Sequence, residues 1–258
     1  MTTSSDPTEL VRSLGYRASA DAIRALIAHA TKSKMSPAQT LLELGELEKR
    51  ERGQRNLAAR EKAATLGPVK PLDRFDWTHP RTIDRELFED LHATLGFIER
   101  SENVLLRGQS GVGKSTLAKH LGLAALAKGY TVRFVTLAAA LADLLRRESL
   151  PAIERRLKRY TGCDLLIIDE LGYVPCNSDA ADLFYRIIAK RHEVAPVVIT
   201  TNLAYKAWGS VFGDARGLAA LVDRFAQHAH VLDIDAESWR DKERKERTEK
   251  KRGPVKRR

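Results

Sequence analysis

Glycine, lysine and hydroxyl residues stand at a fixed spacing between Gly108 and Thr116, where the chain reads GQSGVGKST. This run fits the pattern GxxxxGK[ST], in which the glycines let backbone N–H groups turn inward around phosphate oxygens. Lys114 is predicted to reach the β- and γ-phosphates of ATP, and the hydroxyl of Ser115 is predicted to bind Mg²⁺. The predicted phosphate-binding residues are Gly108, Gln109, Ser110, Gly111, Val112, Gly113, Lys114, Ser115 and Thr116.

Two carboxylates follow the apolar run from Leu165 to Ile168. Asp169 is predicted to hold Mg²⁺ through water, and Glu170 is predicted to polarise the attacking water as a general base. A kinase that transfers phosphate to an alcohol has no need for a water-activating carboxylate at this place. The pair therefore favours an ATPase, which hydrolyses ATP to ADP and phosphate.

Two further polar residues are candidates for the same reaction. Asn202 follows the apolar run 196–200, and it is predicted to orient the attacking water between the γ-phosphate and Glu170. The alternative for Asn202 is a turn residue at the end of a strand. Arg224 stands near the end of a predicted helix, from which an arginine can reach the γ-phosphate of a neighbouring subunit. The alternative for a helical arginine is a surface or salt-bridge residue, and the residues alone leave both alternatives open.

The elements that must position these side chains alternate between strand and helix patterns. The strand patterns cover residues 104–106, 132–135, 165–168, 197–200 and 231–234. Such an alternation predicts an α/β fold, with a mostly parallel sheet and helices on both of its faces. The phosphate-binding run would then follow the first strand and open the helix that begins near Lys114.

The chain before this region contains helical patterns and no strand pattern. Ser36 and Gln39 can cap each other's backbone at the start of a helix that runs to about Ala64. A linker with two prolines and a glycine follows at residues 67–71. We therefore expect a small all-helical N-terminal domain that serves oligomerisation or contacts with DNA or a partner, an ATPase core and a charged, partly disordered tail. Their predicted bounds are 1–66, 67–240 and 241–258.

Composition excludes several classes of protein. Of the 258 residues, 43% are hydrophobic and 30% are charged, which excludes fibrous and fully disordered chains. The sequence has no apolar run of membrane-spanning length, no signal-peptide pattern, and no zinc-ligand spacing around Cys163 and Cys176. We therefore expect a reduced cytoplasmic protein that makes no contact with a membrane.

The charge is unevenly distributed along the chain. The whole chain carries 44 Lys and Arg against 34 Asp and Glu, a formal net charge of +10. Residues 237–258 hold 11 of these basic residues and 5 of the acidic ones. A basic balance of this kind favours nucleic acid or another anionic partner, and a merely solvated basic tail is the alternative.

Several motifs together resemble one known family. They are the phosphate-binding run, IIDELGY at 167–173, Thr201–Asn202, WGSVFGD at 208–214 and DRF at 223–225. In these motifs the chain resembles the IstB-like transposition helper ATPases, which are AAA+ proteins related to the DnaC-type helicase loaders and to the initiator DnaA. The resemblance extends over about residues 12–240 and includes FDW at 75–77, which is similar to the family's motif before the ATPase core.

The resemblance implies a fold, an assembly and several residue roles. The fold would be an AAA+ P-loop NTPase core with a five-stranded parallel sheet, without a C-terminal lid domain because only a short charged segment follows the last strand. ATP would bind between the subunits of a homo-oligomer, where Arg224 aligns with the family's arginine finger. Without a lid, nucleotide sensing would depend on Asn202 and on a neighbouring subunit. Phe75 and Trp77 would either help to form the adenine pocket or pack at the domain junction.

A basic stretch between Leu141 and Tyr160 is the candidate DNA-binding element. Its position matches the extra helical element that lines the DNA path in the initiator and loader group. Guanidinium and ammonium groups on one face would contact phosphates without reading the base sequence. The alternative is a solvated helix face held by ion pairs. The candidate residues are Arg146, Arg147, Arg155, Arg156, Lys158 and Arg159.

These expectations predict an ATP-dependent, DNA-binding AAA+ regulator of DNA transposition. The protein would form a homo-oligomer on duplex target DNA with little sequence preference, and it would recruit and activate an IstA-like transposase. The first alternative is a DnaC-like loader of a replicative helicase, which shares the fold and differs in its partner. A small-molecule phosphotransferase and a scaffold that binds ATP with little turnover are the others.

Overall fold

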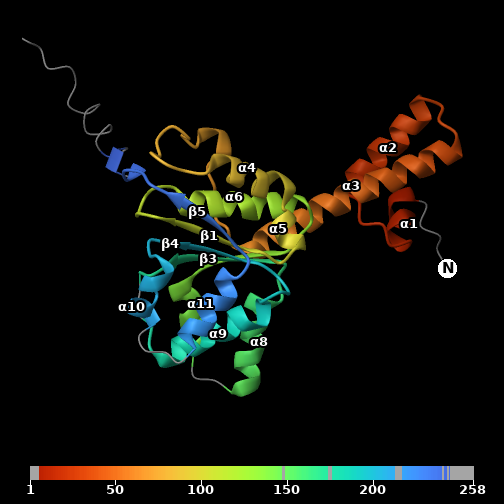
Figure 1. Cartoon of the computed structure of the whole chain (residues 1–258). Coiled ribbons are helices and arrows are strands. Elements are labelled where there is room, and N and C mark those ends of the chain that lie inside the picture. Colours follow the sequence, from red (N-terminus) through yellow and green to blue (C-terminus); the bar gives the residue numbers. More distant parts are fainter. Residues whose placement is uncertain are drawn as a thin grey trace, which may run out of the picture. The chain divides into compact units, whose positions relative to one another are not determined.

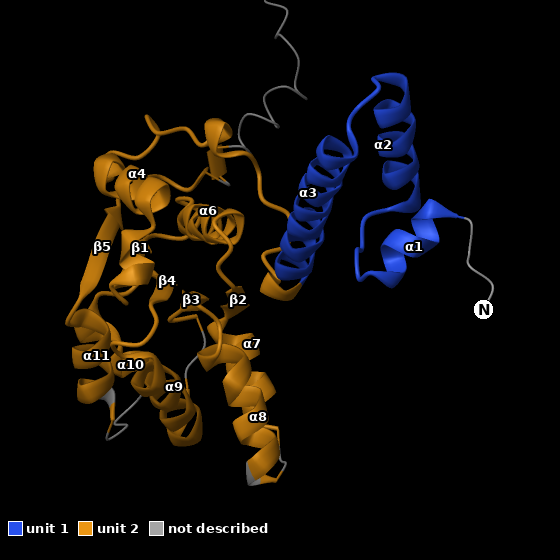
Figure 2. Cartoon of the chain, turned by 90° about the vertical axis from the view of Figure 1, so that its right-hand side faces the viewer, with its two compact units in different colours: residues 1–62 blue, residues 63–258 orange. Residues whose placement is uncertain are grey.

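The computed structural model describes residues 6–146, 149–173, 176–212, 217–239, 241–242 and 244 of the chain. The chain divides into two compact units, residues 1–62 and residues 63–258, which Figure 2 shows in two colours. No helix in the described part of the chain is long and apolar enough to cross a membrane.

The first unit is made of helices with capped N-termini. Its helices are α1 (Pro7–Ser13), α2 (Ala20–Lys32) and α3 (Pro37–Ala64), the last of which ends just beyond the boundary between the units. At the start of α3, the N–H of Gln39 donates to the hydroxyl of Ser36, and the N–H of Ser36 donates to the side chain of Gln39. The reciprocal cap predicted from the sequence is therefore present.

A buried carboxylate ties α3 to the chain before α2. The backbone N–H groups of Arg17 and Ala18 each donate to one oxygen of Glu48 at 2.8 Å. Ala18 also joins Ile23 and Leu47 in the small apolar core of this unit. Glu48 is 6% exposed, so its hydrogen bonds hold the unit together beside a very small core.

The second unit is built around a five-stranded parallel sheet (Figure 1). Its strands lie side by side in the order β2-β3-β4-β1-β5, and every pairing between neighbours is parallel. This sheet and its helices confirm the α/β fold expected from the alternating patterns. The strands are β1 (Asn103–Gly108), β2 (Val132–Thr136), β3 (Leu165–Leu171), β4 (Val197–Thr201) and β5 (Ala229–Ile234).

Helices cover both faces of the sheet (Figure 1). One face packs against α6 (Lys114–Ala127), which in turn packs against α4 (Arg85–Thr94). On the other face, inward-facing residues of the strands form one apolar core with α7 (Leu137–Leu144), α8 (Leu150–Thr161), α9 (Ser178–Arg191) and α11 (Leu218–Ala226). The other described helices of this unit are α5 (Gly96–Glu99), α10 (Gly209–Phe212) and the short 3₁₀ turns Leu72–Arg74 and Tyr205–Ala207.

Burial explains why the strands read as continuous apolar runs in the sequence. Leu165, Leu166, Ile167 and Ile168 are each 0% exposed, since helices cover both faces of the sheet. Parallel strands end at the same edge of a sheet, so the polar residues at the carboxyl ends of β3 and β4 and the loop after β1 are brought together there. That edge carries the candidate site.

Candidate nucleotide-binding site

The phosphate-binding run forms the loop between β1 and α6. Gly111 has φ of +82° and Gly113 has φ of +98°, which are left-handed conformations that favour glycine. Gly108 lies so close to the end of β5 that a Cβ there would stand 2.3 Å from the carbonyl oxygen of Ile234. The glycine spacing in the sequence therefore reflects both the turn of the loop and its packing against the sheet.

Lys114 begins α6, and its amine turns back over the loop. Its Nζ donates to the carbonyl oxygens of Gly108 at 2.8 Å and Gln109 at 2.6 Å, and the residue is only 6% exposed. The loop thus holds a positive charge close to its own backbone N–H groups and to the N-terminus of α6. This arrangement suits a bound phosphate group.

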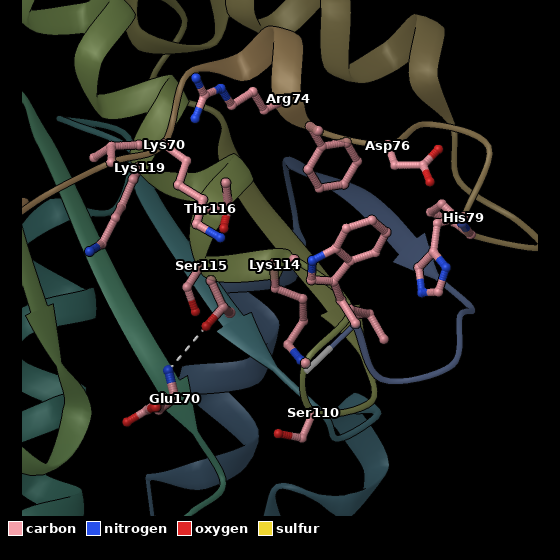
Figure 3. A pocket seen from close by; sticks show the side chains of 18 of the residues that line it. Lys70, Arg74, Asp76, His79, Ser110, Lys114, Ser115, Thr116, Lys119 and Glu170 are labelled. Carbon is pink, nitrogen blue, oxygen red and sulfur yellow. Dashed lines mark hydrogen bonds between the residues drawn. The ribbon is translucent and has the colours of Figure 1, made fainter. Parts of the chain in front are cut away.

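A chain of hydrogen bonds joins the loop to the ends of β3 and β4. The hydroxyl of Ser115 donates to Oδ1 of Asp169 at 2.8 Å, and the hydroxyl of Thr200 donates to the same oxygen. The backbone N–H of Glu170 donates to the hydroxyl of Thr200 at 3.0 Å, as the dashed line in Figure 3 shows. Thr200 is not among the site residues predicted from the sequence. The only indication for it in the sequence is a hydroxyl group near the end of a strand beside the site.

Glu170 differs from both of its neighbours in β3. Asp169 and Leu171 are buried, whereas Glu170 is exposed and lines the pocket. The register between β3 and β4 shifts between Ile168 and Leu171, and Glu170 adopts φ of +64°. The local break in the strand leaves the carboxyl group of Glu170 open to the pocket while Asp169 stays held by hydroxyl groups.

The pocket in front of these residues has a volume of about 600 Å³. The phosphate loop lines the pocket together with the linker and the segment that follows it. Figure 3 shows Lys70 and Lys119 on one side of Lys114, and Asp76 and His79 on the other. The lining residues are Pro68, Val69, Lys70, Pro71, Arg74, Phe75, Asp76, His79, Pro80, Ser110, Gly111, Val112, Gly113, Lys114, Ser115, Thr116, Lys119, Glu170, Tyr173, Thr200 and Trp239.

The two aromatic residues of the FDW motif lie in different surroundings. Phe75 lines the pocket, and a Cβ on Gly113 would stand 2.6 Å from its ring. Trp77 packs against Phe75 with ring centroids 4.7 Å apart and against Phe88 with centroids 5.4 Å apart. The guanidinium group of Arg85 lies 5.2 Å from the Trp77 ring. Trp77 thus supports the wall on which Phe75 stands, and it is absent from the described lining of the pocket.

Asn202 and Arg224 lie outside the described lining of the pocket. Asn202 is exposed directly after β4. The guanidinium group of Arg224 lies 5.1 Å from the ring centroid of Tyr185 and donates to its hydroxyl. Within one chain, Arg224 therefore joins α11 to α9 and takes no part in the described lining of the pocket. Its predicted role in a neighbouring subunit stays a prediction.

The described members of the predicted DNA-binding set lie on α8 and just after α7. Arg155, Lys158 and Arg159 are exposed on α8, and Arg146 is exposed after α7. Arg156 is half-buried, and its guanidinium group donates to the carbonyl oxygen of Asp143 at 3.0 Å.

The acidic side chain of Asp143 also moderates the charge of this region. Its Oδ2 lies 3.6 Å from a guanidinium nitrogen of Arg159 and accepts a hydrogen bond from Tyr160 at 2.9 Å.

Three predictions from the sequence concern residues outside the described part of the chain. They are Arg147, the Gly213–Asp214 end of the WGSVFGD motif, and the tail from residue 245.

The donor set at the carboxyl end of β3 fits Mg²⁺. Ser115 and Asp169 offer oxygen atoms 2.8 Å apart, and Glu170 follows directly in sequence. Mg²⁺ prefers oxygen ligands, and it is usually held by one or two carboxylates together with water and substrate phosphates. In the described part of the chain, no group of three or more His, Cys, Asp or Glu residues could hold a metal by itself. The residues present therefore fit a metal that arrives with a nucleotide.

Comparisons with known proteins agree with this geometry. Residues 9–247 match the family described as IstB-like ATP binding protein. The chain is 38% identical over 223 residues to the insertion sequence IS21 putative ATP-binding protein of Pseudomonas aeruginosa, covering 86% of this chain and 84% of that protein. It is 32% identical over 228 residues to the insertion sequence IS5376 putative ATP-binding protein of Geobacillus stearothermophilus, covering 88% and 90%.

Solved structures share the fold at low sequence identity. AMPPCP-bound DnaA from Aquifex aeolicus superposes with a TM-score of 0.56 at 19% identity, covering 72% of this chain and 56% of that chain. The crystal structure of DnaI superposes with a TM-score of 0.52 at 17% identity, covering 67% and 90%. At these identities the likeness concerns the fold.

Proposed function

The chain belongs to the family of IstB-like ATP binding proteins, and on that premise we propose that it is an ATPase that regulates DNA transposition. In this proposal, the protein forms a homo-oligomer on duplex DNA in its ATP-bound state and recruits a transposase. The observation that carries the catalytic part is the hydrogen-bonded chain from Ser115 through Asp169 and Thr200 to the backbone of Glu170.

Each side chain has a task that follows from its surroundings. Lys114 binds phosphate oxygens of the nucleotide. Its amine gives up its hydrogen bonds to the loop carbonyl oxygens when it does so. Ser115 and Asp169 would hold Mg²⁺, which would supply positive charge to offset the charge of the phosphates. Glu170 accepts a proton from the attacking water, because its carboxyl group is the exposed one of the pair.

Hydrolysis in this proposal needs a second subunit. Asn202 orients the attacking water in the same subunit as Glu170. The guanidinium group of Arg224 rests on Tyr185, and it stabilises transition-state charge on the γ-phosphate of a neighbour. A site shared between subunits makes assembly and hydrolysis depend on each other.

Contacts with DNA are assigned to the exposed basic residues of α8. Arg155, Lys158 and Arg159 are of the types that bind the phosphate backbone without reading bases. The relatives that carry the name of an insertion sequence support a role in DNA transposition. A loader of a replicative helicase is the alternative, and it would respond to a helicase rather than to a transposase.

The test is assembly measured by size, with duplex DNA present or absent, in ADP or in a slowly hydrolysed ATP analogue. We expect a large complex only with DNA and the analogue together. Lys114→Ala, which lacks the phosphate-binding amine, is expected to stay small in every condition. A wild-type protein that stays monomeric and ignores DNA in both nucleotides would contradict the proposal. If the complex forms but binds a helicase and no transposase, the loader alternative is correct.

A further inference from the structure

The chain beyond β5 crosses the phosphate loop and closes one side of the pocket. We call this segment, residues 235–239 and 241–242, the strap. The backbone N–H of Trp239 donates to the carbonyl oxygen of Gly111 at 3.0 Å. A Cβ on Gly111 would stand 2.5 Å from the hydroxyl oxygen of Ser238, so the strap and the loop are in close contact.

The strap is also bound to the segment that follows the linker. The backbone N–H of Arg81 donates to the carbonyl oxygen of Asp235 at 2.7 Å. Nε2 of His79 lies 2.8 Å from the carbonyl oxygen of Glu237, and the amine of Lys242 lies 3.5 Å from a carboxyl oxygen of Asp76. These bonds together hold the strap in one place over the loop.

The same bonds place an aromatic ring at the wall of the pocket. Trp239 lines the pocket, and its ring meets the ring of His79 edge-on with centroids 4.9 Å apart. The amine of Lys242 lies 4.5 Å from the centroid of the Trp239 ring and so holds the indole in place. Aromatic rings that line a pocket of this size are suited to contact the flat ring system of a base.

The two sides of the pocket differ in chemistry. Figure 3 shows His79 on one side of Lys114, and Lys70 and Lys119 on the other. Ammonium groups attract phosphates, whereas aromatic rings favour an uncharged base. The His79 side, to which Trp239 belongs, is therefore the better match for the base of the nucleotide.

We propose that Trp239 and His79 bind the base of the nucleotide by contact with its flat ring system. The strap, which follows the last strand of the sheet, would then contribute a residue to nucleotide binding. This inference rests on the proposed nucleotide binding by the phosphate loop. It does not depend on DNA binding or on assembly.

The test compares a nucleotide with a ligand that has no base. Affinities of the full chain for ADP and for inorganic tripolyphosphate, both with Mg²⁺, are measured by calorimetry for the wild type, Trp239→Ala and Trp239→Phe. We expect Trp239→Ala to bind ADP about tenfold more weakly or worse, the size of a lost aromatic stack. Binding of tripolyphosphate should change by less than about twofold, and Trp239→Phe should retain most of the ADP affinity.

Tryptophan fluorescence supplies a second readout, which does not require that a variant lose its affinity for ADP. The chain has three tryptophans, and Trp208 is 0% exposed, so it is shielded from a ligand. We expect ADP to quench the wild-type emission and tripolyphosphate to leave it unchanged. The response to ADP should be lost in Trp239→Phe.

The results that would contradict this inference differ from those that would contradict the proposed function. Unchanged ADP binding in Trp239→Ala would overturn the inference, because the ring would then contribute nothing to base binding. Equal losses for ADP and tripolyphosphate would also overturn it, because Trp239 would then act only by shaping the loop. If the wild type bound neither ligand, the proposed nucleotide site itself would be refuted. Failure to assemble on DNA would refute the proposed function and leave the inference about base binding intact.

Discussion

At the scale of single residues, the adjacent carboxylates of Asp169 and Glu170 lie in different surroundings. Asp169 is 6% exposed and accepts hydrogen bonds from Ser115 and Thr200, whereas Glu170 is open to the pocket. A buried carboxylate that accepts two hydrogen bonds from hydroxyl groups is in a suitable place to hold a cation, whereas a general base must reach the water in the pocket. An exposed neighbour, fixed through its backbone by Thr200, is free to act as the base.

Glu170→Gln is expected to bind ATP as the wild type does and to lose hydrolysis by about a hundredfold or more, the usual contribution of a general base. Phosphate release and the affinity for ATP are the two measurements. Glu193→Gln is the matched control, because Glu193 is also exposed and also has a positive φ, of 57°, but lies in the turn after α9. If Glu170→Gln hydrolysed ATP at the wild-type rate, another group would have to be the base.

At the scale of elements, α9 and α11 meet where Arg224 lies against Tyr185. An aromatic face and a hydroxyl acceptor fix the guanidinium group of a flexible side chain, so less conformational freedom is lost when it meets a phosphate. In the proposed shared site, this contact would hold Arg224 ready to meet the nucleotide of a neighbouring subunit.

Arg224→Ala is expected to abolish ATP hydrolysis while monomers keep their affinity for ATP, because the guanidinium group would act on a neighbour's nucleotide. Arg224→Lys should recover little, since an ammonium group lacks the planar fork. The measurement is hydrolysis by equal mixtures of Arg224→Ala and Lys114→Ala subunits. Activity should return in the mixture, because some interfaces then combine an intact loop with an intact arginine. An inactive mixture would speak against a shared site.

The basic face of α8 is expected to act through charge alone. Replacing Arg155, Lys158 and Arg159 together by alanine should weaken binding to duplexes of any sequence. The slope of log affinity against log salt concentration should fall by about 3, roughly one for each phosphate that the variant no longer neutralises. Filter binding at several salt concentrations measures both effects.

The control for α8 lies on the neighbouring helix. Arg186 and Lys190 of α9 are basic residues paired with Glu154, and their replacement by alanine should leave the slope unchanged. An unchanged slope in the α8 variant, or an equal change in the α9 variant, would place the DNA elsewhere on the protein.

At the scale of the whole molecule, the two units have separate cores of very different size. The core of the first unit contains Ala18, Ile23 and Leu47, so its stability depends strongly on Glu48. Burial by itself would raise the pKa of Glu48, but hydrogen bonds from the backbone of Arg17 and Ala18 and from Arg52 outweigh it and lower the pKa below 4.5. The charged form is therefore the one that the fold stabilises.

Acid should weaken the first unit through Glu48. A carboxyl group whose pKa is lowered by folding stabilises the fold above its ordinary value of 4.5, and that stability is lost as pH falls through the folded-state pKa. Glu48→Gln should lower the free energy of unfolding of this unit at pH 7 by about 1–3 kcal/mol, because buried N–H groups lose their charged acceptor.

Melting followed by circular dichroism checks this expectation, and the difference between variant and wild type should shrink in acid. Glu46→Gln is the control, because Glu46 is exposed on the same helix and pairs only with Lys49 among the described residues. Affinity for ATP should be unchanged in both variants. Equal melting of the wild type and Glu48→Gln at pH 7 would show that the carboxylate does not hold the unit together.

The sequence by itself determined the features that depend on neighbouring residues. The phosphate loop, the Asp169–Glu170 pair and the strands could be predicted, because loop geometry and the burial of a strand on both faces leave local patterns of glycine, charge and apolar runs. The cap between Ser36 and Gln39 could be predicted for the same reason, since three residues separate its partners.

Only the tertiary structure decided which distant residues meet. Thr200 reaches Asp169 because β3 and β4 are neighbours in the sheet, and Trp239 reaches Gly111 because β5 ends beside β1. The division between Phe75, which lines the pocket, and Trp77, which packs behind it, is likewise a matter of packing. Such contacts depend on strand order and on side-chain packing, and neither leaves a periodic pattern along the chain.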